Sequence, residues 1–152
     1  MEMELTILWR LAVAAILAAA LGWERETTGK SAGLRTHMLV AIGAALFAGL
    51  GHLLVDSFAV YGDRLRFDPT RVLEAVVTGV SFLGAGTIFI ARGRGQVRGL
   101  TTAASLWTTA GVGLATGLGR YVVAVGAAAL VFVVLRVVAA IERRLDASRS
   151  RE

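Results

Sequence analysis

Two short segments of the chain concentrate the side chains best suited to bind a ligand or a partner. They span residues 24–37 and 93–102, and Ser105 follows directly after the second. Guanidinium groups beside helix N-termini could bind an anion or a regulatory partner. The alternative is that the arginines orient the chain in a membrane and pair locally with the glutamates. The residues concerned are Glu24, Arg25, Glu26, Arg35, Thr36, His37, Arg98, Thr101, Thr102 and Ser105.

A second candidate site lies at membrane depth and comprises Arg10, Glu74, Thr78 and Ser81. The last three are spaced at i, i+4 and i+7, which places a carboxylate and two hydroxyls on one face of a helix. A charge at membrane depth is costly, so Glu74 needs a partner, an escape to the headgroups or a function. Arg10 and Glu74 are expected at a similar depth, where they could form an ion pair or extend to the headgroups. The functional alternative is a cation or proton site at Glu74.

Several kinds of chemistry are excluded. The chain has no cysteine, which removes thiolate catalysis and the usual sulfur-rich zinc sites. Gly29-Lys30-Ser31 resembles the end of a phosphate-binding P-loop, but the upstream glycine and the preceding strand are missing. The net charge of +5 does not predict nucleic-acid binding, because the basic residues lie between apolar runs without an aromatic platform. We predict no catalytic residues, no enzyme activity and no cofactor, and leave a metal undecided.

The elements that carry these residues are predicted to be membrane-spanning helices. Of 152 residues, 56% are hydrophobic and 18% are charged, and the mean hydropathy is +0.69. Ordinary soluble domains are less apolar than this. Because a spanning helix needs roughly 20 apolar residues, the chain has room for about five such helices with short loops. The predicted fold class is therefore all-α, a polytopic transmembrane helix bundle.

Five apolar runs give the predicted helices, at residues 5–23, 36–60, 72–91, 100–118 and 121–141. The first run could be a signal peptide, but Glu2 and Glu4 stand where such a peptide carries positive charge. Segment 61–71 is a polar loop that holds the only proline. Gly119 and Arg120 are expected to form the tight turn before the last helix.

The distribution of positive charges predicts the orientation of the bundle. With the N-terminus outside, ten lysines and arginines fall on the cytoplasmic side and four fall outside, while Arg10 and Arg136 lie within helices. The C-terminus is then cytoplasmic. Residues 1–145 are expected to form the transmembrane domain, and residues 146–152 a short basic cytoplasmic tail.

Glycines and hydroxyl side chains in the fourth run are expected to serve helix packing. Gly113 and Gly117 form a G-x-x-x-G motif, which lets two helix backbones approach closely. The hydroxyl residues of this run either bond between helices or line a polar path. They are Thr101, Ser105 and Thr108 on one face, with Thr102 and Thr109 beside them.

Three ordered motifs carry a specific family resemblance. They are LGWERETTGKSAGLRTHMLVAIGAALF at 21–47, GVSFLGAGTIF at 79–89 and VRGLTTAASLWTTAGVGLATGLG at 97–119. With them the sequence resembles the MgtC/SapB family of bacterial inner-membrane proteins, as a member with the membrane domain only. The matching signature positions are Glu24, Arg25, Glu26, Gly33, Leu34, Arg35, Thr36 and His37, then Phe82, Leu83, Gly84, Ala85 and Gly86, and then Arg98, Gly99, Leu100, Thr101, Thr102, Ala103 and Trp107.

The resemblance implies a domain of about five helices in the bacterial plasma membrane and a link to magnesium limitation. Members of this family support growth in low magnesium and survival inside host cells. The family founder resembles a modulator of the membrane ATP synthase more than a magnesium transporter. The sequence departs from longer members because it ends soon after the fifth helix, without their cytoplasmic C-terminal domain. Any function of that domain is therefore in question for this chain.

Three functional hypotheses follow. The leading one is a non-enzymatic membrane protein that acts in adaptation to magnesium limitation or stress by modulating a membrane partner. The second is a transporter of magnesium, another cation or protons. The third is a small-molecule or lipid-headgroup site between the two polar segments. Expected partners are the lipid bilayer, a membrane protein such as ATP synthase and a second copy of the chain, with no nucleic acid.

Overall fold

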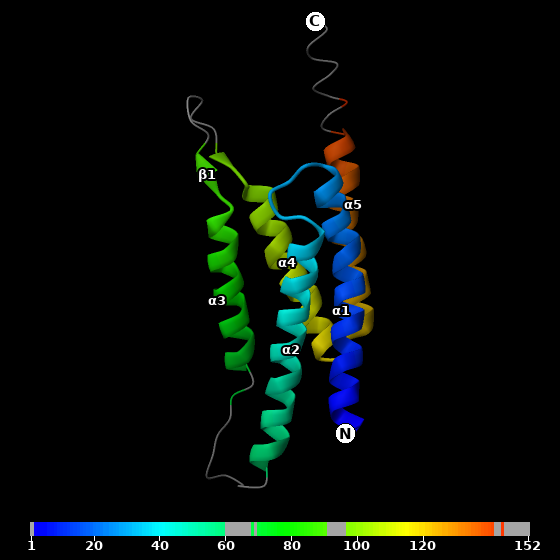
Figure 1. Cartoon of the computed structure of the whole chain (residues 1–152), viewed down its shortest axis with the longest axis vertical. Coiled ribbons are helices and arrows are strands. Elements are labelled where there is room, and N and C mark those ends of the chain that lie inside the picture. Colours follow the sequence, from blue (N-terminus) through cyan, green and yellow to red (C-terminus); the bar gives the residue numbers. More distant parts are fainter. Residues whose placement is uncertain (1, 60–67, 69, 91–96, 142–143, 145–152) are drawn as a thin grey trace, which may run out of the picture.

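The computed structural model describes residues 2–59, 68, 70–90, 97–141 and 144 (Figure 1). Its helices are α1 (Glu2–Thr27), α2 (Leu34–Ala59), α3 (Thr70–Gly86), α4 (Leu100–Gly117) and α5 (Tyr121–Val133), and the π-helical turn η2 (Val134–Val138) continues α5. Strands β1 (Phe89–Ile90) and β2 (Val97–Arg98) pair antiparallel. The prediction of an all-α bundle with five helices is confirmed.

Two predicted boundaries are wrong. The run 72–91 is not one helix, because α3 ends at Gly86 and Phe89–Ile90 pairs with Val97–Arg98. Gly99 follows this pair with a φ of 92°, and a Cβ there would lie 1.9 Å from the carbonyl oxygen of Thr87. Only glycine fits such a position. Segment 24–37 is also mostly helical, since α1 continues through Thr27 and α2 begins at Leu34.

Glycines in the left-handed conformation end two of the helices. After α1, Gly29 has a φ of 66°. Its N–H donates to the carbonyl of Glu26, and the N–H of Lys30 donates to the carbonyl of Arg25, both at 3.0 Å. This pair of bonds is the Schellman motif, which satisfies the last carbonyls of a helix. Gly119 and Arg120 end α4 in the same way, which confirms the tight turn predicted there.

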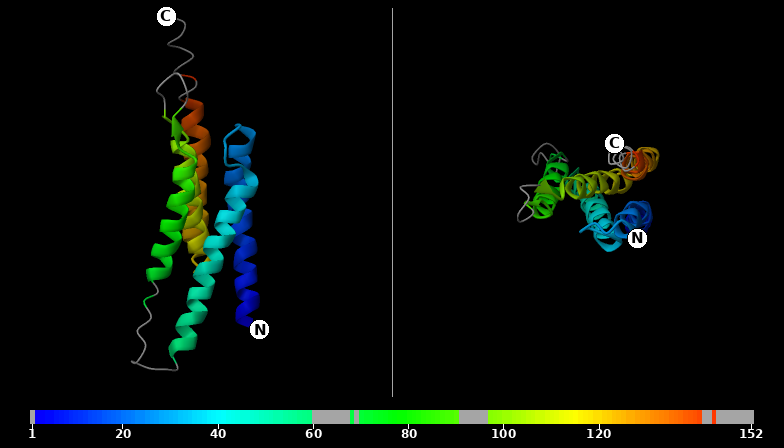
Figure 2. Two further views of the ribbon diagram at one scale, coloured as in Figure 1. Left: turned by 60° about the vertical axis from the view of Figure 1, so that its left-hand side comes forward. Right: turned by 90° about the horizontal axis from the view of Figure 1, so that it is seen from above.

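Helix α4 lies at the centre of the bundle and contacts the other four helices (Figure 2). A Cβ on Gly113 would lie 2.4 Å from the carbonyl oxygen of Ala41, and one on Gly117 would lie 2.5 Å from that of Ala45. The G-x-x-x-G motif thus makes the close helix contact predicted for it, and the structure identifies α2 as the partner. In contrast, α3 stands at the edge of the bundle and packs mainly on α4.

Helix α3 begins just after Asp68. The backbone N–H and the hydroxyl of Thr70 both donate to Asp68 Oδ1, at 2.9 and 2.6 Å. These two hydrogen bonds hold the pKa of Asp68 below its usual value, the hydroxyl making the larger contribution. A charged carboxylate at this point also interacts favourably with the N-terminal end of the helix dipole.

Three helices are long and apolar enough to cross a membrane, namely Glu2–Thr27, Leu34–Val55 and Tyr121–Ile141. Helices α3 and α4 have 17 and 18 residues, lengths of about 25 to 27 Å at 1.5 Å per residue. Large apolar side chains cover the outside of the bundle, among them Phe82 and Val122. This surface suits lipid. The orientation stays a prediction, and the tail 146–152, most of the loop 61–71 and segment 91–96 lie outside the described residues.

Candidate functional site

The end of α1 and the starts of α2 and α4 lie at the same end of the bundle (Figure 1). Five polar side chains are buried there. Each is at most 4% exposed. We call them the buried polar cluster: Glu24, Arg25, His37, Thr102 and Ser105. All five were among the residues singled out from the sequence. Helix packing therefore brings together residues from both polar segments, which are more than 60 positions apart in the chain.

A buried ion pair forms one half of the buried polar cluster. Arg25 Nε donates to Glu24 Oε2 at 2.5 Å, so the local Glu-Arg pairing considered from the sequence is present. Arg25 Nη2 also donates to the carbonyl oxygen of Leu135 at 3.4 Å. Leu135 lies in η2, and a π-helical turn disturbs the regular ladder of backbone hydrogen bonds. Arg25 thus ties the end of α1 to the end of α5.

His37 forms the other half of the buried polar cluster, and both of its ring nitrogens are bonded. Nδ1 lies 2.9 Å from the carbonyl oxygen of Gly33, and Nε2 lies 3.2 Å from Ser105 Oγ. A carbonyl only accepts, so Nδ1 carries a hydrogen. Ser105 has one hydroxyl hydrogen, which donates either to Nε2 of a neutral ring or to the Thr102 carbonyl at 2.8 Å. The contact links α2 to α4 in either case.

The other residues of the first candidate site, Glu26, Arg35, Thr36, Arg98 and Thr101, are exposed and do not converge on one pocket. Glu26 Oε2 accepts the backbone N–H of Leu34 at 2.7 Å, so this carboxylate caps the start of α2. Arg35, Thr36, Arg98 and Thr101 are exposed on α2, β2 and α4. The carboxylates of Glu24 and Glu26, which were candidates to hold a ligand, are therefore bonded within the chain. The exposed arginines Arg35 and Arg98 are the candidate binding groups that reach solvent at this end of the bundle.

Arg10 and Glu74 do not form the ion pair that was one possibility from the sequence. Arg10 Nη1 donates instead to the carbonyl oxygen of Gly117 at 2.7 Å, and its guanidinium lies against Gly119. Arg10 therefore stabilises the end of α4, whose last carbonyls need donors. Glu74 lies on α3, at the edge of the bundle, and α1 lies across the molecule from it (Figure 2). The sequence could not predict this, because matching depth says nothing about position around the bundle.

Glu74, Thr78 and Ser81 are all exposed on α3, and we call them the α3 stripe. The face of α3 that packs in the bundle carries Val76, Val80 and Gly84, which are buried. At 100° per residue, Glu74 points about 200° away from Val76. Ser81 Oγ donates to the carbonyl oxygen of Val77 at 2.7 Å, so its bond stays within the helix. The stripe was predicted as one polar face, and it is directed away from the other helices.

A family model described as the MgtC family matches residues 11–144. The chain belongs to the MgtC family. "Protein MgtC" of Brucella abortus (strain 2308) is 44% identical over 124 residues, which cover 82% of this chain and 47% of that protein. "Protein MgtC" of Salmonella typhimurium (strain 14028s / SGSC 2262) is 42% identical over 111 residues, 73% of this chain and 43% of the relative.

A further relative carries a functional name. "Putative magnesium transporter YhiD" of Escherichia coli (strain K12) is 41% identical over 133 residues, which cover 84% of this chain and 58% of the relative. The chain thus spans about half the length of these relatives. No solved structure matches it. With its apolar helices and bacterial relatives, this MgtC-family chain is a protein of the bacterial inner membrane.

In this MgtC-family chain, the described residues offer no preformed metal site. No three of their His, Asp and Glu side chains lie close enough together to hold an ion. Two buried polar atoms in the described part have no hydrogen-bond partner, Arg10 Nε and Thr109 Oγ1. Thr109 lies in α4 beside the buried polar cluster, where an unbonded hydroxyl costs stability.

One participant in the site was missed from the sequence. It is the Leu135 carbonyl, which accepts from Arg25 across 110 residues. Leu135 is an ordinary apolar residue, and its role depends on the π-helical turn rather than on its side chain. The only sequence signal near it is Arg136, which marks a polar interruption in an otherwise apolar helix.

Proposed function

We propose that this chain is a non-enzymatic membrane protein that acts in adaptation to magnesium limitation or stress by contacting a membrane partner. The supporting observation is the α3 stripe, a carboxylate and two hydroxyls on a helix face that is exposed among the described residues. Ionisable side chains within membrane helices almost always face protein or water rather than lipid. A partner that covers the stripe would meet this requirement.

The buried polar cluster has a different part in the proposal. Its ion pair and histidine contacts join α1, α2, α4 and α5 at one end of the bundle. These groups are bonded within the chain, so they act as a scaffold that fixes the helices. Helix α3 is then held on a rigid platform and presents the stripe to a second protein. The resemblance to the MgtC/SapB family makes ATP synthase one candidate for this membrane partner. A second copy of the chain is the other candidate.

Growth and transport assays would test the proposal together. Wild-type protein should restore growth of a deletion strain in low magnesium, and Glu74→Gln should lose this ability at an unchanged protein level. Ser57→Ala is the matched control, because Ser57 is also exposed and its hydroxyl bonds within its own helix, to Leu53 O at 2.8 Å. It should support growth like the wild type.

Transport of a cation is the second candidate, favoured by the name of the Escherichia coli relative and by the carboxylate of Glu74. Purified protein in proteoliposomes separates the two functions. The contact proposal expects no magnesium flux above that of empty vesicles. Robust flux by the purified protein alone, abolished by Glu74→Gln, would reject the contact proposal and support a transporter.

A further inference from the structure

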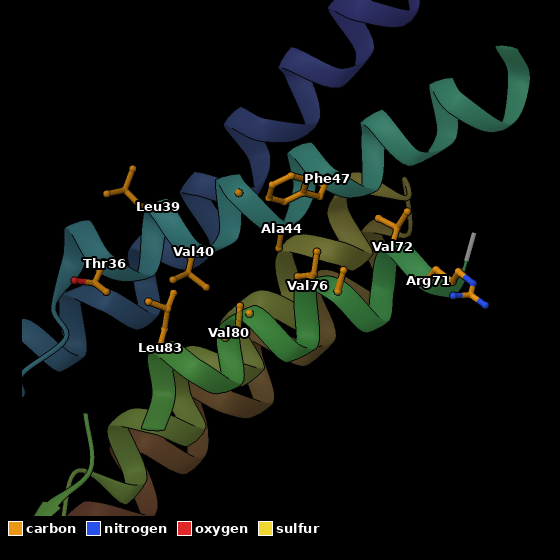
Figure 3. A pocket seen from close by; sticks show the side chains of 13 residues that line it. Thr36, Leu39, Val40, Ala44, Phe47, Arg71, Val72, Val76, Val80 and Leu83 are labelled. Carbon is orange, nitrogen blue, oxygen red and sulfur yellow. The ribbon is translucent and has the colours of Figure 1, made fainter. Parts of the chain in front are cut away.

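A long apolar groove runs between α2 and α3, and the other proposals do not use it (Figure 3). Its volume is about 780 Å³. Ala44, Val76 and Val80 are buried at its floor and pack with Ala110 of α4. Leu39, Phe47 and Leu83 are more than half exposed along its length. The groove therefore has apolar walls along its length and is open on the side that faces away from the bundle.

Two glycines create the space in this groove. Gly43 of α2 and Gly79 of α3 both line it, and a Cβ added to either would meet no atom within 4 Å. Elsewhere Gly113 and Gly117 of α4 touch the backbone of α2 and allow close packing. At Gly43 and Gly79, in contrast, the missing side chains leave a void that an apolar ligand can fill. An unfilled void of this size would forfeit the dispersion contacts of its lining.

The groove has the length and charge of a phospholipid site. Its α3 residues run from Arg71 to Leu83, a rise of twelve steps or about 18 Å at 1.5 Å per residue. One leaflet of a bilayer has a hydrocarbon depth of about 15 Å, half of the usual core. Among the described residues of the lining, Arg71 is the one that is charged, and it lies at one end, beside the start of α3 (Figure 3). The carboxylate of Asp68 is close enough to interact with it. An acyl chain along the groove would place its phosphate beside this guanidinium.

We propose that this groove binds one anionic phospholipid, with an acyl chain between α2 and α3 and the phosphate held by Arg71. Guanidinium groups bind phosphate with charge-assisted hydrogen bonds. The remainder of the lining contributes apolar contact alone, apart from Thr36 at the far end. Val76 of the groove lies two positions from Glu74 of the α3 stripe, a rotation of about 200° around α3, so the acyl chain does not cover Glu74. Arg71 lies at i−3 from Glu74, so the phosphate would be held next to the stripe.

Native mass spectrometry of the full chain, purified in detergent, tests the proposal. The probes are phosphatidylglycerol, phosphatidylcholine with the same acyl chains, and inorganic phosphate. The wild type should retain one phosphatidylglycerol with an affinity about tenfold higher than for phosphatidylcholine, because both lipids offer a phosphate to Arg71 but the quaternary ammonium of choline cancels the net negative charge beside the guanidinium. Arg71→Gln should remove this preference. Gly79→Leu should weaken the binding of both lipids, because leucine fills the groove.

Two further variants make the result decisive. Gly43→Leu fills the groove from α2 and should reproduce the effect of Gly79→Leu, which guards against misfolding of a single variant. Gly126→Leu is the control, since Gly126 on α5 is also open and lies outside the groove. It should bind lipid like the wild type. Three results would overturn the proposal. The wild type could bind both lipids equally, or it could bind inorganic phosphate as tightly as phosphatidylglycerol. It could also form a dimer that the leucine variants dissociate.

Discussion

The buried polar cluster and the α3 stripe contain similar chemistry in opposite environments. Each combines a glutamate with hydroxyl side chains on helices of the same bundle. In the cluster, Glu24 is 2% exposed and paired with Arg25. In the stripe, Glu74 is exposed at the edge of the bundle. A glutamate beside hydroxyl residues can therefore be a scaffold residue or a contact residue. The position of the residue around the helix axis decides which of the two it is.

The largest expected difference is between the two glutamates. Glu24→Gln leaves the Arg25 charge buried without a counter-charge, which costs about 3 to 5 kcal/mol in the free energy of unfolding. Glu74→Gln changes an exposed side chain and should alter that free energy by no more than about 0.5 kcal/mol. Unfolding of both purified variants in mixed detergent micelles, followed by tryptophan fluorescence, measures the difference.

A double variant controls this experiment. Glu24→Gln combined with Arg25→Met removes both charges, so it should be more stable than Glu24→Gln alone. If Glu24→Gln and Glu74→Gln destabilised the protein equally, the distinction between scaffold and contact residues would be lost.

A smaller difference is expected between two serines. Ser105 Oγ contacts His37 on another helix, whereas Ser81 Oγ bonds only to the backbone of its own helix. Ser105→Ala should lower the free energy of unfolding by about 1 kcal/mol, since it leaves a buried ring nitrogen without its partner. Ser81→Ala should change it by less than about 0.5 kcal/mol. The same unfolding assay applies, and a larger loss for Ser81→Ala would argue that the stripe is structural.

Much of the fold could be predicted from the sequence. The lengths of the apolar runs predicted five helices, and the spacing of Gly113 and Gly117 predicted a close helix contact, although not that its partner is α2. The positions of glycine marked the turn at Gly119. These features depend on neighbours in the sequence, so local chemistry is sufficient to predict them.

The failures depend on contacts that residue type and apolar run length do not show, one within a short hairpin and the others between distant segments. The strand pair of Phe89–Ile90 with Val97–Arg98 replaces a predicted helical end, although the residues themselves are apolar enough for a helix. Arg10 was matched to Glu74 by depth, but its acceptor is the backbone of Gly117. The polar segment 24–37 was expected as an open loop, yet Glu24 and His37 are buried. Which side of a helix meets its neighbours is decided by the whole bundle.

Site-specific photocrosslinking in living cells tests the central claim most directly. A photoreactive amino acid at Thr78 lies in the α3 stripe, and one at Val122 lies on α5, where the side chain is 88% exposed. In cells grown in low magnesium, the account predicts a discrete protein adduct from position 78 that Glu74→Gln abolishes, and none from position 122. Absence of an adduct at 78, or the same adduct from both positions, would contradict a partner surface on α3.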